Sequence, residues 1–414
     1  MKKLLYILNI DWFFVSHRLP IAKAALEQNY QVHLASHFSN PTAAIEVQGI
    51  NTHPIKIARS SRSPLGELRS FFSILNVMRK VRPHLVHLVT IKPVIYGGIA
   101  ARLLGIPAVA AIPGLGYPFS SKSLIMKCFQ YLIIVLYRFA LGGSNCQVIV
   151  QNRHDLLLLR ERIRVSPDRI TLIHGSGVAV SGYPVVPEMS DPLIVVMAAR
   201  LLHDKGVHEF VEAARQVKHR HPEVRFLLAG DLDVEHPSSL SYVELEAIRN
   251  DGVVEHCGFV QDIPSLFARA NMVVLPSYRE GLPKVLIEAA ACGRAVITTS
   301  TPGCEDAILP DETGLLVPVR DAKALAEAVI RLIEDPQLRH RLGERGRCLA
   351  VDRYDIGTVI STHLEIYRSL EALSVPFRRG SRCAGPQDPP PRPDHPASCS
   401  VPLGWDEVDR KSVV

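Results

Sequence analysis

Short apolar runs alternate with helical patterns along most of this chain, and they do so in two successive sets. Strand-like runs of the first set occupy residues 3–10, 31–35, 84–89, 107–112, 147–151 and 169–173, and those of the second set occupy 193–199, 225–229, 256–260, 272–275, 295–299 and 314–317. Such alternation predicts parallel sheets with helical crossovers. Because 414 residues exceed the limit of about 250–300 residues for a single core, we expect two α/β domains.

A proline-containing stretch without periodicity, residues 178–192, separates the two sets and is interpreted as a linker. The predicted units are an N-terminal domain over 1–180, a C-terminal domain over 190–352 and a helix over 353–374 that can return to the N-terminal domain. Residues 376–414 contain eight prolines and almost no periodicity, so we expect a disordered tail.

Charge is distributed unevenly between the two halves. Residues 1–180 hold 21 Lys and Arg against 7 Asp and Glu, whereas the whole chain has a net charge of only +6. The excess indicates an anionic partner for the first half. No DNA-binding motif or aromatic-basic interleaving occurs, so a nucleic acid is not expected. An anionic membrane surface or a phosphorylated lipid fits this half better.

The cysteines and the apolar segments indicate in which cellular compartment the chain is expected. Eight cysteines are scattered without CxxC or CxxxC pairs, which argues against a zinc site or a disulfide framework and fits a reducing cytoplasm. No apolar run reaches the roughly 18–20 residues of a membrane span. A helical pattern over 121–141, edged by basic residues, fits either packing on the sheet or lying on a membrane interface.

The stretch from Leu275 to Gly293 carries the sharpest functional pattern. The apolar run 272–275 predicts a buried strand that ends in a polar loop, Pro283 suits the first position of a helix, and Gly293 suits its end. A helix N-terminus favours a phosphate. Glu288 then lies about 7–8 Å along the helix, at 1.5 Å per residue. The spacing of Glu280 and Glu288 suits carboxylates at opposite ends of a nucleoside-diphosphate ligand, although two solvated glutamates are an equal alternative.

Polar residues and glycines follow several other predicted strands, where ligands bind in parallel α/β sheets. Arg200 and Lys205 follow the run 193–199 and offer forked and point-charge contacts to phosphate. The other candidates are His17 and Arg18 at the start of a predicted helix over 21–28, Lys92 in the loop Thr90–Pro93, the glycines Gly114 and Gly116, and Val260 at a strand end where the backbone can read a flat base. For Arg18 and Lys92 the alternative is a solvated surface side chain, and for Gly114 and Gly116 it is a plain turn.

These residues together resemble the retaining family 4 glycosyltransferases of GT-B fold, in which two Rossmann-like domains face each other across a cleft. The resemblance covers about residues 1–372 and is carried by Arg200 with Lys205-Gly206, by Glu280-Gly281-Leu282-Pro283 with Glu288-Ala289, and by Thr313–Val317. In the first half, Ser16–Ile21 and Gly114–Gly116 look like the branch that adds N-acetylhexosamines or similar sugars to undecaprenyl-diphosphate-linked acceptors. The sequence departs from the family at Trp12-Phe13-Phe14, where a glycine-rich loop is common, and lacks a histidine often found after the fifth strand.

The resemblance implies a role for each matching residue. Arg200 and Lys205 neutralise the donor diphosphate, Glu280 holds the donor sugar and Glu288 accepts the ribose hydroxyls. The backbone of Gly281, Leu282 and Pro283 caps phosphate and sugar, with Val260 beside the base; His17, Arg18, Lys92, Gly114 and Gly116 face the acceptor. The resemblance also implies that the acceptor attacks the face of the sugar from which the nucleotide departs, without a protein nucleophile, a metal or a cofactor. The implied substrates are a UDP-linked donor and a lipid-diphosphate-linked acceptor in bacterial surface polysaccharide synthesis. The implied location is a peripheral position on the inner face of the cell membrane.

Two other functions remain compatible with the same residues. A GT-B sugar-nucleotide 2-epimerase binds the same donor without an acceptor, but the basic first half and the two spaced glutamates argue against it. A non-catalytic nucleotide-sugar binder is favoured by loss of Glu280 or Lys205, and both residues are present.

Overall fold

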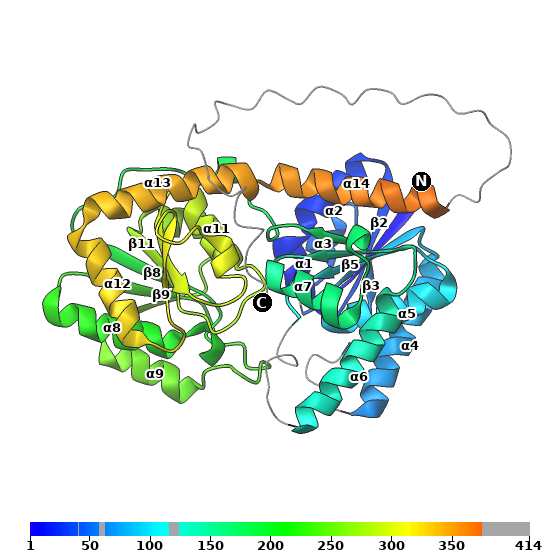
Figure 1. The fold of residues 1–414 in the computed structure, drawn as a ribbon, viewed down its shortest axis with the longest axis horizontal. Helices are drawn as coiled ribbons and strands as arrows, with labels where there is room; N and C mark the ends of the chain where they lie inside the picture. Colours follow the sequence, from blue (N-terminus) through cyan, green and yellow to red (C-terminus); the bar gives the residue numbers. More distant parts are fainter. Residues whose placement is uncertain (40, 58–62, 116–123, 375–414) are drawn as a thin grey trace, which may run out of the picture. The chain divides into compact units, whose positions relative to one another are not determined.

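The computed structural model of the protein describes residues 1–39, 41–57, 63–115 and 124–374. Among these residues, seven parallel strands form a first sheet in the order β3-β2-β1-β4-β5-β6-β7 (Figure 1). The order reverses between β1 and β4, because β1 pairs with β2 on one side and with β4 on the other. The strands are β1 (Lys2–Ile7), β2 (Tyr30–Ser36), β3 (Asn51–Pro54), β4 (Leu85–Val89), β5 (Ala108–Ile112), β6 (Cys146–Val150) and β7 (Ile170–Leu172).

Both faces of the first sheet are covered by helices. Leu5 and Ile7 of β1 belong to one core, whereas Leu4 and Tyr6 belong to another, as the period of two in a strand requires. The first core is closed by α4 (Pro64–Val81), α5 (Ile91–Leu104) and α6 (Leu124–Leu141), and the second by α1 (Asp11–His17), α2 (Leu19–Glu27) and α14 (Ile356–Ser374). Short helices α3 (Ala43–Glu46) and α7 (Arg153–Leu158) complete this half.

A second sheet of six parallel strands follows in the described chain, in the order β10-β9-β8-β11-β12-β13. Its order reverses between β8 and β11, which places a second switch point at the carboxyl ends of these strands. The strands are β8 (Ile194–Ala198), β9 (Arg225–Ala229), β10 (Glu255–Gly258), β11 (Met272–Leu275), β12 (Ala295–Thr299) and β13 (Gly314–Val317). The helices are α8 (Val207–Arg220), α9 (Tyr242–Asp251), α10 (Ile263–Ala268), α11 (Lys284–Ala291), α12 (Ala322–Glu334) and α13 (Pro336–Arg353).

The chain passes between the two sheets twice, and the two passages are hydrogen-bonded to each other. The amide of Val178 donates to the carbonyl of Tyr354, and the amide of Ile356 donates to the carbonyl of Val178, each at 2.9 Å. After the second passage α14 packs on α2 and on strands of the first sheet (Figure 1). A buried hydrogen bond of 2.9 Å joins the hydroxyls of Tyr6 and Tyr367. The last helix of the second half thus returns to the first sheet.

The structure corrects several predicted elements. The strand β3 was not expected, since Asn51–Pro54 is polar and ends in proline, features that edge strands tolerate. Two predicted loops are helical: α1 occupies Asp11–His17, and α5 begins at Ile91. Pro283 is the N-cap of α11 and not its first residue, while Gly293, with φ of 68°, ends the helix as predicted.

Two predictions concern the membrane and the tail. In the described part of the chain, no helix is both long and apolar enough to cross a bilayer. The helix expected over 121–141 is observed as α6 from Leu124 onward, and it packs on α5. The predicted tail over 376–414 lies outside the described residues.

Candidate active site

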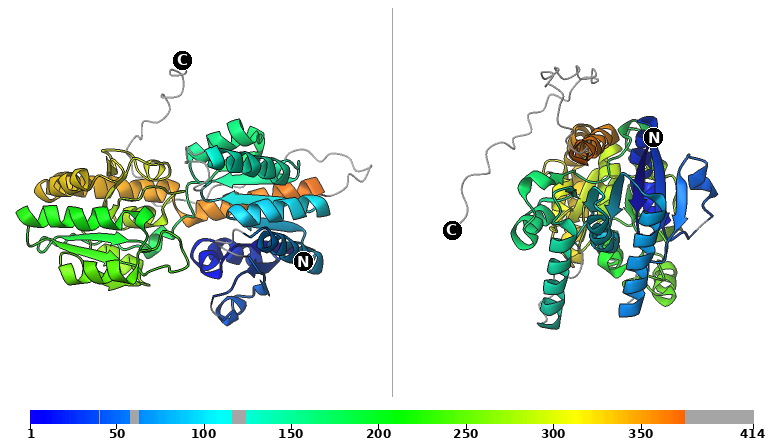
Figure 2. Two further views of the ribbon diagram at one scale, coloured as in Figure 1. Left: turned by 90° about the horizontal axis from the view of Figure 1, so that it is seen from below. Right: turned by 90° about the vertical axis from the view of Figure 1, so that its right-hand side faces the viewer.

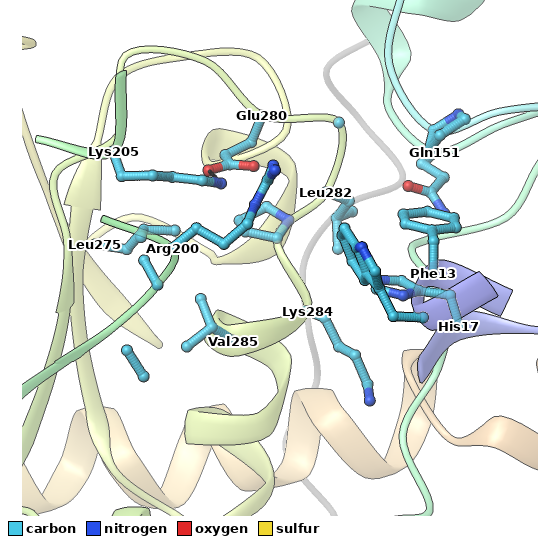
Figure 3. A pocket seen from close by; sticks show the side chains of 16 residues that line it. Phe13, His17, Gln151, Arg200, Lys205, Leu275, Glu280, Leu282, Lys284 and Val285 are labelled. Atoms are coloured by element: carbon cyan, nitrogen blue, oxygen red, sulfur yellow. Dashed lines mark hydrogen bonds and ion pairs between the residues drawn. The ribbon is translucent and has the colours of Figure 1, made fainter. Parts of the chain in front are cut away.

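A pocket of about 270 Å³ lies where the carboxyl ends of β8 and β11 meet the segment that follows β1 (Figure 3). Figure 3 shows Arg200, Lys205 and Glu280 on one side and Phe13, His17 and Gln151 on the other. Both sheets therefore contribute walls. The lining residues are Trp12, Phe13, His17, Pro113, Gln151, Ala198, Ala199, Arg200, Lys205, Leu275, Glu280, Gly281, Leu282, Pro283, Lys284 and Val285.

Arg200 and Lys205 enter the pocket from the loop between β8 and α8. This loop closes on the segment after β11 at Gly206, where φ is 76° and an added Cβ would lie 2.2 Å from the carbonyl oxygen of Pro276. Only glycine fits there without strain. The Arg200 guanidinium donates to Asp233 at 2.7 Å and lies 5.7 Å from the ring centroid of Trp12. Two predicted phosphate contacts are thus brought into one pocket.

Glu280 is paired with Lys205 in the same pocket. The ammonium of Lys205 donates to Oε1 of Glu280, and their side chains are 20% and 12% exposed. A partly buried pair of this kind is less screened than a surface pair. The pair keeps one cation and one carboxylate beside the space where a diphosphate and a sugar are expected.

Gly281 is fixed by contact with the first half of the chain. A Cβ on this residue would lie 1.3 Å from the carbonyl oxygen of Pro113, so no side chain fits. Asn152 donates to the Gly281 carbonyl at 2.8 Å and to Asp155 at 2.9 Å, while its own oxygen caps α7 by accepting from the Asp155 amide. Gly114, a predicted acceptor contact, lies against Gly281: its added Cβ would be 3.4 Å from the Gly281 Cα.

The amino end of α11 forms another wall of the pocket. Its N-cap, Pro283, makes no side-chain hydrogen bond to the first turn, and Lys284 and Val285 line the pocket. Unsatisfied first-turn amides attract anions. Glu288 lies one turn further on, is 9% exposed and is outside the pocket lining. Its Oε1 accepts from the Tyr183 hydroxyl at 2.8 Å and lies 3.2 Å from the Lys284 ammonium.

The opposite wall comes from α1, the helix that replaces the predicted loop. Phe13 and His17 are one turn apart, and their rings stack with centroids 4.1 Å apart at an angle of 4°. Burial, together with the charges of Arg18 and Lys284, lowers the pKa of His17 to about 3. His17 is therefore neutral near pH 7 and offers the pocket a hydrogen-bonding group, not a positive charge.

Besides Glu288 and Gly114, four predicted site residues are not among the lining residues, and three of these four are placed by the structure. Arg18 is only 1% exposed and is directed into the core beside the tyrosines Tyr6 and Tyr367, so neither an acceptor contact nor a solvated side chain describes it. Lys92 is in α5 and forms an ion pair with Glu67 at 2.7 Å. Val260 follows β10 outside the pocket. The fourth, Gly116, lies outside the described residues.

The pocket contains further residues beyond those predicted from the sequence. Trp12 and Phe13 were noted only as a departure from the family, yet both line the pocket. Gln151 follows β6, and a polar residue at that strand end was a usable signal. Tyr183 lies in the predicted linker, so its contact with Glu288, 105 residues away, had no local signal.

Comparisons with known proteins agree with this geometry. The family described as glycosyl transferases group 1 matches residues 184–348, and the family described as glycosyl transferase 4-like matches residues 3–152. Together the two matches take in most of the chain, with one family on each sheet.

Relatives match over most of their length. The chain is 28% identical over 364 residues to the N,N'-diacetylbacillosaminyl-diphospho-undecaprenol alpha-1,3-N-acetylgalactosaminyltransferase of Campylobacter jejuni, covering 84% of this chain and 94% of the relative. It is 23% identical over 290 residues to the UDP-Gal:alpha-D-GlcNAc-diphosphoundecaprenol alpha-1,3-galactosyltransferase of Escherichia coli, covering 67% and 73%.

A solved structure confirms the expected GT-B architecture. The sucrose-phosphate synthase of Thermosynechococcus elongatus superposes with a TM-score of 0.75 at 21% identity, over 90% of this chain and 100% of that one. At this identity the likeness concerns the fold alone.

Proposed function

We propose that the chain, which belongs to the family 4 glycosyltransferases of GT-B fold, is a hexosyltransferase. It transfers an N-acetylhexosamine or a related hexose from a UDP-linked donor to an undecaprenyl-diphosphate-linked saccharide. The acceptor class comes from the Campylobacter jejuni and Escherichia coli relatives, whose names specify such acceptors. The reaction belongs to the synthesis of a bacterial surface polysaccharide.

The observation that carries the proposal is the pairing of Lys205 with Glu280 beside Arg200 and the amino end of α11. The donor diphosphate lies between the two cations and the first-turn amides of α11, where the charge that develops on the leaving group is stabilised. Glu280 is then next to the donor sugar, and Glu288, one turn into α11, reaches the ribose hydroxyls. These groups supply the stabilisation without a metal ion.

The acceptor enters from the other wall, past Trp12, Phe13 and His17. The aromatic rings offer flat apolar surfaces to a saccharide, and the neutral imidazole offers a hydrogen bond. The acceptor hydroxyl attacks the face of the sugar from which UDP departs, so the anomeric configuration is retained. The proton passes to the leaving phosphate oxygen, as the resemblance to the retaining family 4 glycosyltransferases implies.

A lipid-linked acceptor requires access to a membrane surface, which we assign to α4 and α6, at the inner face of the cell membrane. Both helices pack on α5, and the right-hand view of Figure 2 shows them extending in the same direction. Leu65, Leu68 and Phe72 of α4 are 73%, 52% and 49% exposed. On α6, Tyr131, Leu132, Val135 and Phe139 are 42–68% exposed, next to Arg138. Apolar side chains edged by cations suit an anionic bilayer interface.

The proposal is tested with purified protein, a panel of radiolabelled UDP- and GDP-sugars, and vesicles with or without an undecaprenyl-diphosphate-linked saccharide. We expect label to enter the lipid fraction only with a UDP-sugar and the acceptor together, in EDTA as well as without it, and NMR of the product to show the donor's anomeric configuration. Turnover of a nucleotide sugar without acceptor would indicate the epimerase, and binding without turnover in any mixture would indicate the binder.

A further inference from the structure

Three potential metal ligands lie together on the second half of the chain, outside the pocket. His203 is in the loop that carries Arg200 and Lys205, His208 is in the first turn of α8, and Glu244 is in the first turn of α9. One ring nitrogen from each histidine and one carboxylate oxygen of Glu244 all lie within 4.8 Å of one another. None of the three residues lines the pocket.

The separations fit coordination better than direct hydrogen bonding. Oε1 of Glu244 is 3.6 Å from Nε2 of His203 and 3.4 Å from Nε2 of His208. Both distances exceed those of ordinary N–H···O hydrogen bonds, which are about 2.7–3.2 Å. A tetrahedron built on Zn–N and Zn–O bonds of roughly 2.0–2.1 Å has ligand-to-ligand edges of about 3.3–3.4 Å. The distance to His208 matches this edge, and the distance to His203 is slightly longer.

The Glu244 carboxylate is held in position through Oε2, the oxygen that does not face the histidines. Oε2 of Glu244 accepts hydrogen bonds from the amide and the hydroxyl of Ser241, at 2.8 Å and 2.7 Å, in a capping box at the start of α9. This leaves Oε1 directed at the two imidazoles, in the way that outer hydrogen bonds orient metal ligands. The same hydrogen bonds lower the pKa of the Glu244 carboxyl.

The imidazoles are also placed by local structure. Their rings stack with centroids 5.2 Å apart at 26°. The backbone of His203 is tied to the segment before α9, since its amide donates to the Ser238 carbonyl at 2.8 Å. Other histidines near carboxylates in the described chain, such as His221 beside Glu223 and Glu334, provide one imidazole and not two.

We propose that His203, His208 and Glu244 bind one transition-metal dication of the Zn²⁺ class, with water completing the coordination. Two imidazole nitrogens and one carboxylate oxygen suit such ions, whereas Mg²⁺ and Ca²⁺ prefer sites made of oxygen. The ion joins the 200–206 loop to the first turns of α8 and α9, and so restrains the segment from which Arg200 and Lys205 reach the pocket. It is a positioning site, separate from the transfer chemistry.

The test uses the full-length protein, freed of metal by a chelator and kept free of nucleotides, which bind divalent ions themselves. Thermal unfolding is followed with Zn²⁺, Mg²⁺ or Ca²⁺, and Co²⁺ is added as a spectroscopic probe. We expect Zn²⁺ to raise Tm, Mg²⁺ and Ca²⁺ to leave it unchanged, and one Co²⁺ per chain to show the visible absorption of a four-coordinate ion. Hydrogen exchange should slow in 200–208 when Zn²⁺ is bound.

Variants separate this site from adventitious binding. His208→Ala and Glu244→Gln should weaken Zn²⁺ binding at least about tenfold, and Gln at 244 retains a capping-box side chain, so α9 stays capped. The matched control is His219→Ala, which removes an exposed histidine from the last turn of the same helix. The proposal is overturned if Zn²⁺ stabilises His208→Ala as it does the wild type, if His219→Ala abolishes the response, or if Mg²⁺ acts equally.

Discussion

At the residue scale, Glu280 and Glu288 occupy different environments although they are eight positions apart. Glu280 lines the pocket and is paired with Lys205, whereas Glu288 lies behind the first turn of α11 and is held by Tyr183 and Lys284. Substitution of each should therefore affect a different part of the ligand.

We expect Glu288→Gln to weaken UDP binding by roughly one to two powers of ten, because hydrogen bonds to a charged group contribute about 1.5–3 kcal/mol. Glu280→Gln should leave UDP affinity unchanged or slightly tighter, since Lys205 loses its partner and is free for the diphosphate, while turnover falls. Calorimetry with UDP and radiolabelled transfer measure the two effects. Equal loss of UDP affinity in both variants, with folding intact, would contradict these positions.

Gly281 provides a second prediction at this scale. Gly281→Ala places a Cβ 1.3 Å from the Pro113 carbonyl oxygen, and the contact between the two halves must open to relieve the overlap. Transfer should fall at least tenfold with little change in the unfolding of either half, and Gly182→Ala, which meets nothing within 4 Å, should behave as wild type. An active Gly281→Ala protein would show that this contact is not needed in turnover.

At the scale of elements, α14 attaches to the first sheet through a buried polar cluster. His87 Nδ1 lies 2.6 Å from the Tyr367 hydroxyl, and the rings of His87 and His363 stack with centroids 5.6 Å apart. Burial and the nearby Arg18 charge lower the pKa of His363 to about 3. Burial also lowers the pKa of His87 well below its usual value.

Because of this cluster, the free energy of unfolding should decrease as the pH falls. A histidine with a folded pKa of about 3 and an unfolded pKa of about 6.5 binds its proton first in the unfolded chain, so stability is lost as pH falls below about 6.5. For His363 the loss between pH 7 and pH 5 is on the order of 2 kcal/mol. His363→Gln should remove that part of the pH dependence in denaturant titrations, and His219→Gln should leave it unchanged. An unaltered profile for His363→Gln would mean that folding does not lower the pKa of His363.

The exposed faces of α4 and α6 carry the other prediction about elements. Vesicles of anionic lipid should bind the protein more tightly than neutral ones, and binding should strengthen steeply below 0.15 M salt, where the screening length exceeds about 8 Å. Leu132→Asp with Val135→Asp should weaken sedimentation with anionic vesicles. The control is Val243→Asp, which changes a still more exposed apolar residue on α9. Equal binding to neutral and anionic vesicles would count against a role for the basic first half.

At the scale of the whole molecule, the described chain ends with α14, which already completes the cover of the first sheet. We therefore expect removal of residues 376–414 to leave soluble expression, Tm and transfer unchanged. Residues 376–414 contain eight prolines and almost no hydrophobic periodicity, so this segment has few side chains that can pack on the rest of the protein. Loss of soluble expression in the truncated protein would show that the segment packs on the body.

The sequence alone determined the architecture, because strand and helix periods are local properties of the chain. The two sets of strands, the parallel sheets, the buried strand Met272–Leu275 and the end of α11 at Gly293 could all be predicted. The family resemblance assigns Arg200, Lys205 and Glu280 to one donor site. They meet in one pocket because β8 and β11 are neighbouring strands at a switch point.

Only the tertiary structure decided where the remaining side chains point. Arg18 and Lys92 follow strands as the rule requires, yet one is buried in the core and the other is paired with Glu67, since the helices that begin there turn their side chains away from the pocket. Contacts such as Tyr183 with Glu288, Pro113 with Gly281, and His203 and His208 with Glu244 join residues 36 to 168 positions apart. Periodicity describes neighbours along one element, so contacts between distant elements appear only when the chain has folded.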